Sequence, residues 1–326
     1  MRRPARIGCS VMCMTGEGEG ADPTCSPARR HADQGNGGPA LYVIRRVAKI
    51  GVTGVSGHLG GLIARRLSES GISQTLLIRD PARAPQLAGA DVRVGDYADA
   101  DAVRRALAGI DTVLMVSLPG STTRLAQHTT FIDAAVDANV RQLVYTSFLG
   151  AGPSATFSHS RLHWATEAHI RASGLQFTLL RNNLYADLLP SMVGVDGTIR
   201  GPAGRGRVSA VVREDVAEVA AAVLGRPEAH IGATYDLTGP QALTLDEVAE
   251  VISVGTGRTV IYQPETVEEA HASRASYNAP RWQVEGWVSS YLAIAAGEMQ
   301  SVSDTIPQIA GRRATTLAEL ISEGKH

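Results

Sequence analysis

The sequence predicts an α/β fold, a doubly wound parallel-sheet domain followed by a smaller mixed α/β C-terminal lobe. Six short apolar segments alternate with helix-forming segments through residue 180, and parallel strands need such crossover helices. Beyond residue 181 this alternation loosens into shorter pieces. We therefore expect a sheet domain over 47–181 and a lobe over 182–326 that is not fully separable from it.

The elements of the sheet domain follow from local patterns. The apolar run 47–53 suits a buried parallel strand, and 59–70 has helical spacing closed by Gly71. The further expected strands are 74–78, 91–94, 111–116, 141–146 and 175–180. The further expected helices are 81–87, 98–108, 122–138 and 159–172. Their regular succession predicts the open sheet.

The smaller lobe shows clear helix starts. Three Ser/Thr-x-x-Glu capping boxes begin at Thr244, Thr266 and Thr316. Strand-like pieces lie between the helices at 208–212, 234–237 and 259–262. We expect these pieces to build a mixed lobe that rests on the carboxyl edge of the sheet.

Residues 1–46 are expected to be a disordered N-terminal extension. This stretch mixes Gly, Pro, Ser and charges without periodicity, so it offers too little apolar area to offset the entropy of ordering it. All three cysteines, Cys9, Cys13 and Cys25, lie here, and their spacing matches no common zinc pattern. We expect no metal, and the cysteine placement fits a reduced, cytoplasmic compartment.

The charge balance restricts the partners. With 31 basic and 32 acidic residues, the net charge is −1, whereas binding to nucleic acid or a membrane surface usually needs a basic excess. No apolar stretch is long enough to span a membrane. The sequence therefore predicts no nucleic-acid partner and no membrane partner, and it leaves the oligomeric state open, a homodimer included.

A glycine-rich turn follows the first expected strand. It reads Thr53-Gly54-Val55-Ser56-Gly57-His58-Leu59-Gly60 and opens the first helix. Glycines allow the sharp turn, the close approach to a pyrophosphate and the tight packing of helix on strand, while free helix N–H groups face the anion. The turn predicts a Rossmann-type NAD(P)-binding domain; the alternative is a tight turn that binds nothing. The cofactor contacts expected here are Gly54, Ser56, Gly57, His58, Leu59 and Gly60.

The end of the second strand predicts which dinucleotide is bound. Arg79 lies 19 residues after Gly60, where an NAD site would place a lone acidic residue for the ribose hydroxyl. A guanidinium there can pair with a 2′-phosphate and stack on adenine, which favours NADPH over NADH. Asp80 argues for NADH if it binds the ribose, but capping of a short helix at Pro81 is the simpler role.

Other strand ends complete the expected cofactor site. Asp96 is placed to accept from the adenine amino group, and its alternative role as a helix cap suits Asp99 better. Ser117 and Leu118 follow the fourth strand, where the middle of the cofactor is expected to run, and Ser147 follows the fifth, near the nicotinamide.

These residues together resemble the NmrA-like branch of the atypical short-chain dehydrogenases, most closely the bacterial type-2 NAD(P)H:quinone oxidoreductases. The resemblance covers nearly all of 47–322. Its further motifs are Arg79-Asp80-Pro81, Gly95-Asp96-Tyr97, Arg124-Leu125-Ala126-Gln127-His128, Tyr145-Thr146-Ser147, Thr178-Leu179-Leu180-Arg181-Asn182, Tyr185, Arg213-Glu214-Asp215-Val216-Ala217 and Tyr235-Asp236-Leu237-Thr238-Gly239. The resemblance implies an NADPH-binding sheet domain with a pocket between it and the smaller lobe.

The usual acid–base pair of short-chain dehydrogenases is missing. Lysine occurs only at Lys49 and Lys325, so no Tyr-x-x-x-Lys pair exists. Relatives often keep a lysine in the helix before the sixth strand, and that position is Ala168. The sequence therefore assigns no catalytic residue by a motif. His163 is a candidate proton donor, and the alternative is that His159 and His163 lie on a polar helix surface.

Three residues are expected at the acceptor. Phe148 could stack on a flat substrate, and Asn183 and Tyr185 lie across the pocket at the end of the sixth strand. Packing between the lobes is the alternative for Phe148 and Tyr185.

Two functions fit these observations. The first is an NADPH-dependent reductase that transfers hydride to a quinone or a similar flat, electron-poor small molecule. A reductase of secondary metabolism acting on an aromatic intermediate is a variant of it. The second is a non-catalytic NADP(H)-binding redox sensor of the NmrA type, whose partner would be a regulator protein.

Overall fold

The computed structural model describes residues 48–324. The expected extension at 1–46 and the three cysteines lie outside the described residues. The boundary expected at residue 181 stays a prediction. Among the described residues, no helix is both long and apolar enough to cross a membrane.

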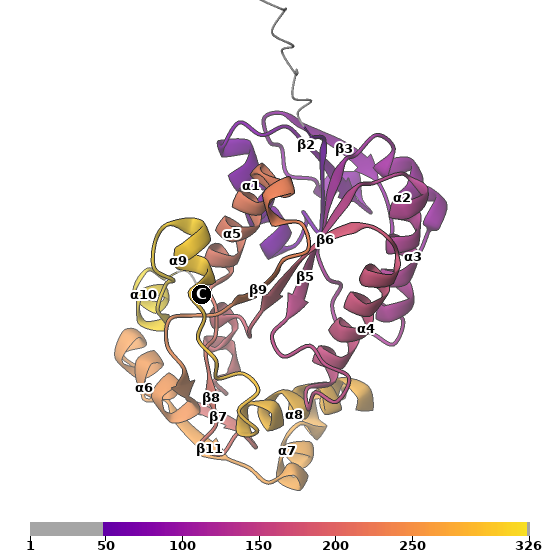
Figure 1. Cartoon of the computed structure of the whole chain (residues 1–326). Helices are drawn as coiled ribbons and strands as arrows, with labels where there is room; N and C mark the ends of the chain where they lie inside the picture. Colours follow the sequence, from indigo (N-terminus) through magenta and orange to yellow (C-terminus); the bar gives the residue numbers. More distant parts are fainter. Residues whose placement is uncertain (1–47, 325–326) are drawn as a thin grey trace, which may run out of the picture. The chain divides into compact units, whose positions relative to one another are not determined.

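Within residues 48–324, one sheet of seven parallel strands forms the centre, in the order β3-β2-β1-β4-β5-β6-β9 (Figure 1). The bounds are β1 Ile50–Thr53, β2 Gln74–Ile78, β3 Ala90–Val94, β4 Thr112–Met115, β5 Gln142–Phe148, β6 Gln176–Asn182 and β9 Thr234–Leu237. The order reverses between β1 and β4, and the crevice at such a reversal is where open sheets bind ligands. The doubly wound parallel sheet is therefore confirmed.

One strand lies in a different place from the one expected. The piece 234–237, assigned to the smaller lobe, is β9 and pairs in parallel with β6, from Leu179 opposite Thr234 to Asn182 opposite Leu237. A local pattern identifies a strand but does not say which neighbour it will pair with. The sheet thus has a seventh strand contributed from far along the chain.

Helices cover both faces of this sheet (Figure 1). On one face, α1 packs on α5, and α5 packs on α9. On the other face, α3 packs between α2 and α4. The bounds are α1 His58–Glu69, α2 Ala100–Leu107, α3 Arg124–Asp137, α4 Ser158–Ala172, α5 Arg213–Gly225 and α9 Thr305–Ala310. Separate apolar cores lie on the two faces, around Ile63 and Val219 on one and around Phe131 and Tyr145 on the other.

The remaining elements enclose a third core. Two small sheets pair β10 (Leu243–Thr244) with β8 (Arg207–Val208) and β11 (Ile261–Pro264) with β7 (Thr198–Gly201). All three predicted capping boxes are confirmed, at the starts of α6 (Leu245–Thr256), α7 (Val267–Ser273) and α10 (Leu317–Ser322). The remaining helix is α8 (Arg281–Ala295). The strand expected over 208–212 is shorter, and the helix expected over 81–87 is a single 3-10 turn, Pro81–Arg83.

Candidate functional site

A cavity of about 690 Å³ opens where β1, β2, β4, β5 and β6 end. Every residue that the sequence predicts for cofactor or acceptor lines it. They are Gly54, Ser56, Gly57, His58, Leu59, Gly60, Arg79, Asp96, Ser117, Leu118, Ser147, Phe148, His163, Asn183 and Tyr185. The cavity thus joins the glycine turn to the side chains expected at the acceptor, although the role of each residue stays a prediction.

The glycine turn has the geometry of an anion site. Gly54 adopts a φ of +68°, and the Gly57 N–H donates to the Gly54 carbonyl over 2.9 Å. A Cβ on Gly60 would lie 2.3 Å from the Gly54 oxygen, so only glycine lets α1 approach β1 this closely. The N-cap of α1, Gly57, provides no side chain to cap the first N–H groups, which leaves them to a phosphate.

Two guanidinium groups stand at the end of β2. Arg79 and Arg83 both line the cavity, and neither forms an ion pair with another described residue. The Asp80 carboxylate accepts from the Ala82 N–H over 3.0 Å, which confirms its capping role. Arg83 was not predicted from the sequence; it ends the 3-10 turn that Asp80 caps, and it lines the same cavity as Arg79. The pair fits a 2′-phosphate.

The ends of β1 and β4 are joined below the cavity. The Thr53 hydroxyl accepts from the Val116 N–H over 2.9 Å and bonds the Tyr97 hydroxyl over 2.6 Å. Tyr97 also donates to the Val116 carbonyl, and burial raises the pKa of its phenol. Asp96 accepts from the Ala98 N–H over 3.0 Å, while Asp99 caps α2 as expected. This network fixes the floor on which the cofactor would lie.

A buried arginine faces the acceptor end; the sequence places it in a family motif but predicts no role for it. Arg124, the first residue of α3, is 3% exposed and lines the cavity. Its Nη2 lies 2.7 Å from Nε2 of His163, whose Nδ1 lies 2.9 Å from the Tyr145 hydroxyl. A guanidinium only donates, so His163 accepts at Nε2 and carries its proton on Nδ1. No periodicity or motif in the sequence marks this arginine as buried.

His163 is therefore buried, and the alternative that places it on a polar helix surface is wrong. His159 is half-buried and also lines the cavity. His163 is 5% exposed, and burial followed by the nearby Arg124 charge holds its pKa well below the usual value. His128 is in the same state. Its Nε2 accepts from the Leu118 N–H, its Nδ1 lies 3.1 Å from the Thr166 hydroxyl, and burial lowers its pKa to about 3.

Ser147 is tied to a buried ion pair. Its hydroxyl donates to Glu167 over 2.6 Å, and Arg181 binds the same carboxylate through two nitrogens at 2.8 and 2.6 Å. The Glu167 charge is thus neutralised by Arg181. Ser147 keeps its lone pairs for a ligand in the cavity.

The acceptor end has an aromatic wall. Phe148 packs edge-on against Phe157 with ring centroids 5.0 Å apart. Tyr185 accepts from Asn182 over 3.2 Å and lies under Arg213 at 5.6 Å. The Asn183 amide is engaged elsewhere, because its Nδ2 lies within 3.0 Å of Ser209 and Met299 oxygens and its Oδ1 accepts from the Leu184 N–H. Asn183 therefore anchors the smaller lobe at the cavity rim.

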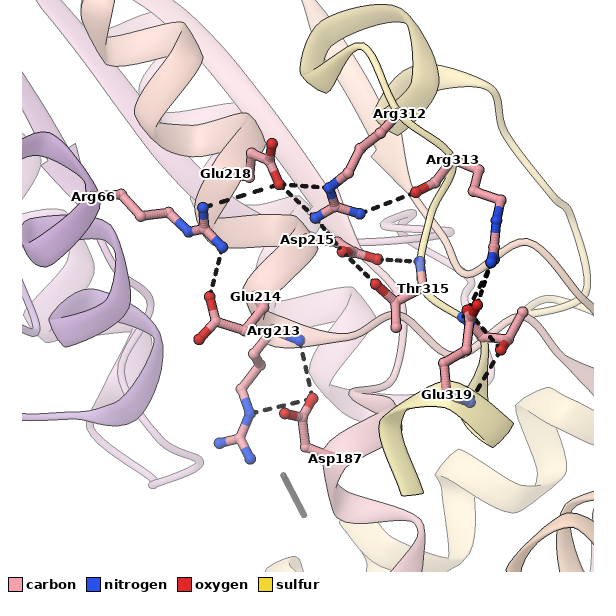
Figure 2. Close-up of polar contacts among 11 residues, drawn as sticks. Arg66, Asp187, Arg213, Glu214, Asp215, Glu218, Arg312, Arg313, Thr315 and Glu319 are labelled. Carbon is pink, nitrogen blue, oxygen red and sulfur yellow. Dashed lines mark hydrogen bonds and ion pairs between the residues drawn. The ribbon is translucent and has the colours of Figure 1, made fainter. Parts of the chain in front are cut away.

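The start of α5 holds this rim in place (Figure 2). The Arg213 N–H donates to Asp187 over 2.9 Å, and Glu214 binds Arg66 of α1 over 2.7 Å. Asp215 is fully buried and accepts from the N–H and hydroxyl of Thr315 over 2.7 and 2.9 Å, and from Arg312 over 2.7 Å. The C-terminal segment and the helix of the glycine turn are thus fastened to one helix end.

Comparison with known proteins identifies the kind of site. The profile of a family described as NAD(P)H-binding matches residues 54–227. Quinone oxidoreductase 2 of Escherichia coli strain K12 is 32% identical over 280 residues, which cover 84% of this chain and 97% of that protein. An NAD(P)H azoreductase of Xenophilus azovorans is 29% identical, over 82% of this chain and 95% of that protein. An NmrA-like family oxidoreductase of Aspergillus flavus is 26% identical, over 80% and 90%.

Solved structures agree with these relatives. An NADPH-dependent quinone oxidoreductase from Escherichia coli, complexed with NADPH, superposes with a TM-score of 0.78 at 30% identity, over 85% of this chain and all of that one. The triphenylmethane reductase of a Citrobacter species, complexed with NADP(H), gives a TM-score of 0.75 at 32% identity, over 84% and 99%.

Proposed function

The chain belongs to the NAD(P)H-binding NmrA-like family and is an NAD(P)H-dependent oxidoreductase, and on this premise we propose that it reduces a quinone or a similar flat, electron-poor acceptor with NADPH. The observation that carries the proposal is the single cavity that runs from the glycine turn to the aromatic wall. When bound, NADPH supplies the hydride. The chain's own residues bind and orient the two reactants in one cavity.

The choice of NADPH over NADH rests on Arg79 and Arg83. Both guanidinium groups line the cavity without a carboxylate partner among the described residues, and the neighbouring Asp80 is engaged in its cap. A phosphate on the ribose would receive two positive charges there, whereas Asp80, the acidic residue of that turn, does not line the cavity and so offers no acceptor to a ribose hydroxyl bound in it. NADPH is therefore expected to bind more tightly than NADH.

A quinone suits a site that lacks the usual acid–base pair. Lys49, the only lysine within 48–324, precedes β1 and so lies at the sheet edge opposite the cavity. Ala168 stands where relatives often keep a lysine. Hydride transfer to a quinone leaves a weakly basic oxyanion that solvent can protonate, so orientation matters more than acid catalysis.

The acceptor end offers the contacts that a flat ring needs. Phe148 and Phe157 present an aromatic wall, and Leu184 and Leu188 add apolar surface to the same cavity. Tyr185 accepts a hydrogen bond from Asn182, so its own hydroxyl proton is available to a carbonyl oxygen. These contacts support the orientation of a ring next to Ser147.

The test is NADPH oxidation by the full chain, followed by absorbance, with p-benzoquinone and with cyclohexanone as a matched ketone. We expect turnover with the quinone and none with the saturated ketone, because reduction of the ketone would need a proton donor for a strongly basic alkoxide. Turnover of both compounds would contradict the claim that the site lacks a general acid for ketone reduction. Tight NADPH binding without turnover of any quinone would favour the redox-sensor alternative, whose regulator partner stays a prediction, as does a homodimer.

A further inference from the structure

The Arg124 guanidinium is a buried positive charge without a negative partner. It is 3% exposed, it lines the cavity, and it forms no ion pair with any other described residue. Its Nε is buried and has no hydrogen-bond partner. Burying a cation without a counter-charge is unfavourable, so natural proteins pair such groups or use them to bind ligands.

The groups around Arg124 do not supply the missing charge. Arg124 contacts Nε2 of His163, and the Tyr145 hydroxyl bonds Nδ1 of the same ring. Burial keeps both His163 and Tyr145 neutral, because it lowers the pKa of the imidazole and raises the pKa of the phenol. The carboxylates of the region have other partners. Glu167 binds Arg181, and Asp187 binds the backbone and side chain of Arg213. A positive charge therefore remains at the acceptor end of the cavity.

The cofactor's own phosphates have other binding groups. The pyrophosphate is expected at the α1 N-terminus, and the 2′-phosphate at Arg79 and Arg83, which follow β2. Arg124 lies on α3, in contact with His163, whose ring centroid is 6.0 Å from that of Phe148. This position is beside the aromatic wall of the acceptor.

We propose that Arg124 makes this end of the cavity an anion site, which selects flat aromatic acceptors that carry a carboxylate. A planar guanidinium pairs with a carboxylate through two parallel hydrogen bonds, and its position is held by His163. That the bound molecule is also reduced rests on the function proposed above. The anion site does not depend on it, because binding can be measured without turnover.

The test uses two probes that cannot be reduced, 2-naphthoate and its neutral counterpart 2-naphthamide. Calorimetric titration of the full chain, with and without NADP⁺, measures their affinities. We expect wild type to bind the carboxylate about tenfold to about a hundredfold more tightly than the amide, which is the range for a charge-assisted hydrogen bond. Arg124→Gln is expected to remove this preference, and Arg124→Lys to restore only part of it.

Two controls separate the explanations. Arg105→Gln removes an exposed cation of α2 that does not line the cavity, and it is expected to keep the preference. NADPH affinity of Arg124→Gln, measured by fluorescence, is expected to stay within about threefold of wild type. A loss of NADPH binding would assign Arg124 to the cofactor and overturn the proposal.

The wild-type comparison stands even if a variant fails to fold. Equal affinity of wild type for naphthoate and naphthamide would overturn the proposal directly. Carboxylate selectivity without turnover of any quinone would keep the anion site and remove only the proposed quinone reduction.

Discussion

The Nη2 atom of Arg124 donates to Nε2 of His163 across 2.7 Å, and this contact determines which nitrogen of the imidazole carries its proton. The proton lies on Nδ1, which is bonded to the buried Tyr145 hydroxyl. Nε2, the nitrogen that faces Arg124, is therefore a hydrogen-bond acceptor. While this contact persists, His163 has no proton on Nε2 to donate to a molecule in the cavity. The proton that completes a reduced acceptor is expected to come from solvent.

Arg79→Ala is expected to weaken NADPH binding by about tenfold to about a hundredfold and to change NADH binding by less than about threefold, because only NADPH loses a charge-assisted contact. Fluorescence titration with both nucleotides measures this. Arg105→Ala, an exposed arginine of α2 outside the cavity, serves as the control. An equal loss of affinity for both nucleotides would show that Arg79 contacts a part that NADPH and NADH share, and not the 2′-phosphate.

Gly60→Ala is expected to lower the free energy of unfolding by about 3 kcal/mol or more, because its Cβ would lie 2.3 Å from a backbone oxygen that cannot move aside. Gly57→Ala is the matched control. Its Cβ would lie 3.3 Å from the same Gly54 oxygen, so stability is expected to change little while NADPH binding weakens. Urea unfolding and nucleotide titration distinguish the two, and equal stabilities would refute the close-packing role of Gly60.

The buried histidines predict a loss of stability in acid. Burial, and then the Arg124 charge, lowers the pKa of His128 from 6.5 to about 3. The unfolded chain takes up this proton below pH 6.5 and the folded chain does not, so the free energy of unfolding falls as the pH drops from 6.5 toward 3. Each such histidine contributes about 1.4 kcal/mol per pH unit across that window.

Urea unfolding at several pH values between 7 and 4.5 tests this slope. His128→Gln keeps an acceptor for the Leu118 N–H and is expected to reduce the slope by about one proton. His271→Gln, an exposed histidine of α7, is expected to leave it unchanged. An unchanged slope in the His128 variant would show that this histidine titrates normally in the folded state.

Asp215→Ala is expected to lower the free energy of unfolding by about 3 kcal/mol, because it leaves Arg312 and two Thr315 donors without their buried acceptor. Glu218→Ala, which removes a partly exposed partner of the same arginine, is expected to cost about 0.5 kcal/mol. Limited proteolysis within the segment that follows Gly311 is expected to become faster only in the Asp215 variant. Similar behaviour of the two variants would show that the buried carboxylate has no special role.

The sequence predicted what depends on local order and missed what depends on distant neighbours. The glycine turn, the cap at Asp80 and the capping box at Thr244 each involve residues within a few positions, and each has the expected geometry. The burial of Arg124 was not predicted, and the strand at 234–237 was predicted correctly but assigned to the smaller lobe. The burial of a single arginine, and the partner of a four-residue strand, are decided by segments far away in the chain.

The pairing of β6 with β9 has a consequence for the chain during synthesis. When the ribosome has made everything through Asn182, the edge of β6 that β9 will cover still has open backbone groups, and these stay open until α5 and then β9 have emerged. The nascent chain is thus most prone to aggregation with other chains in this interval. We expect a fragment that stops before Thr234 to aggregate, even though it contains the whole glycine turn and six of the seven strands.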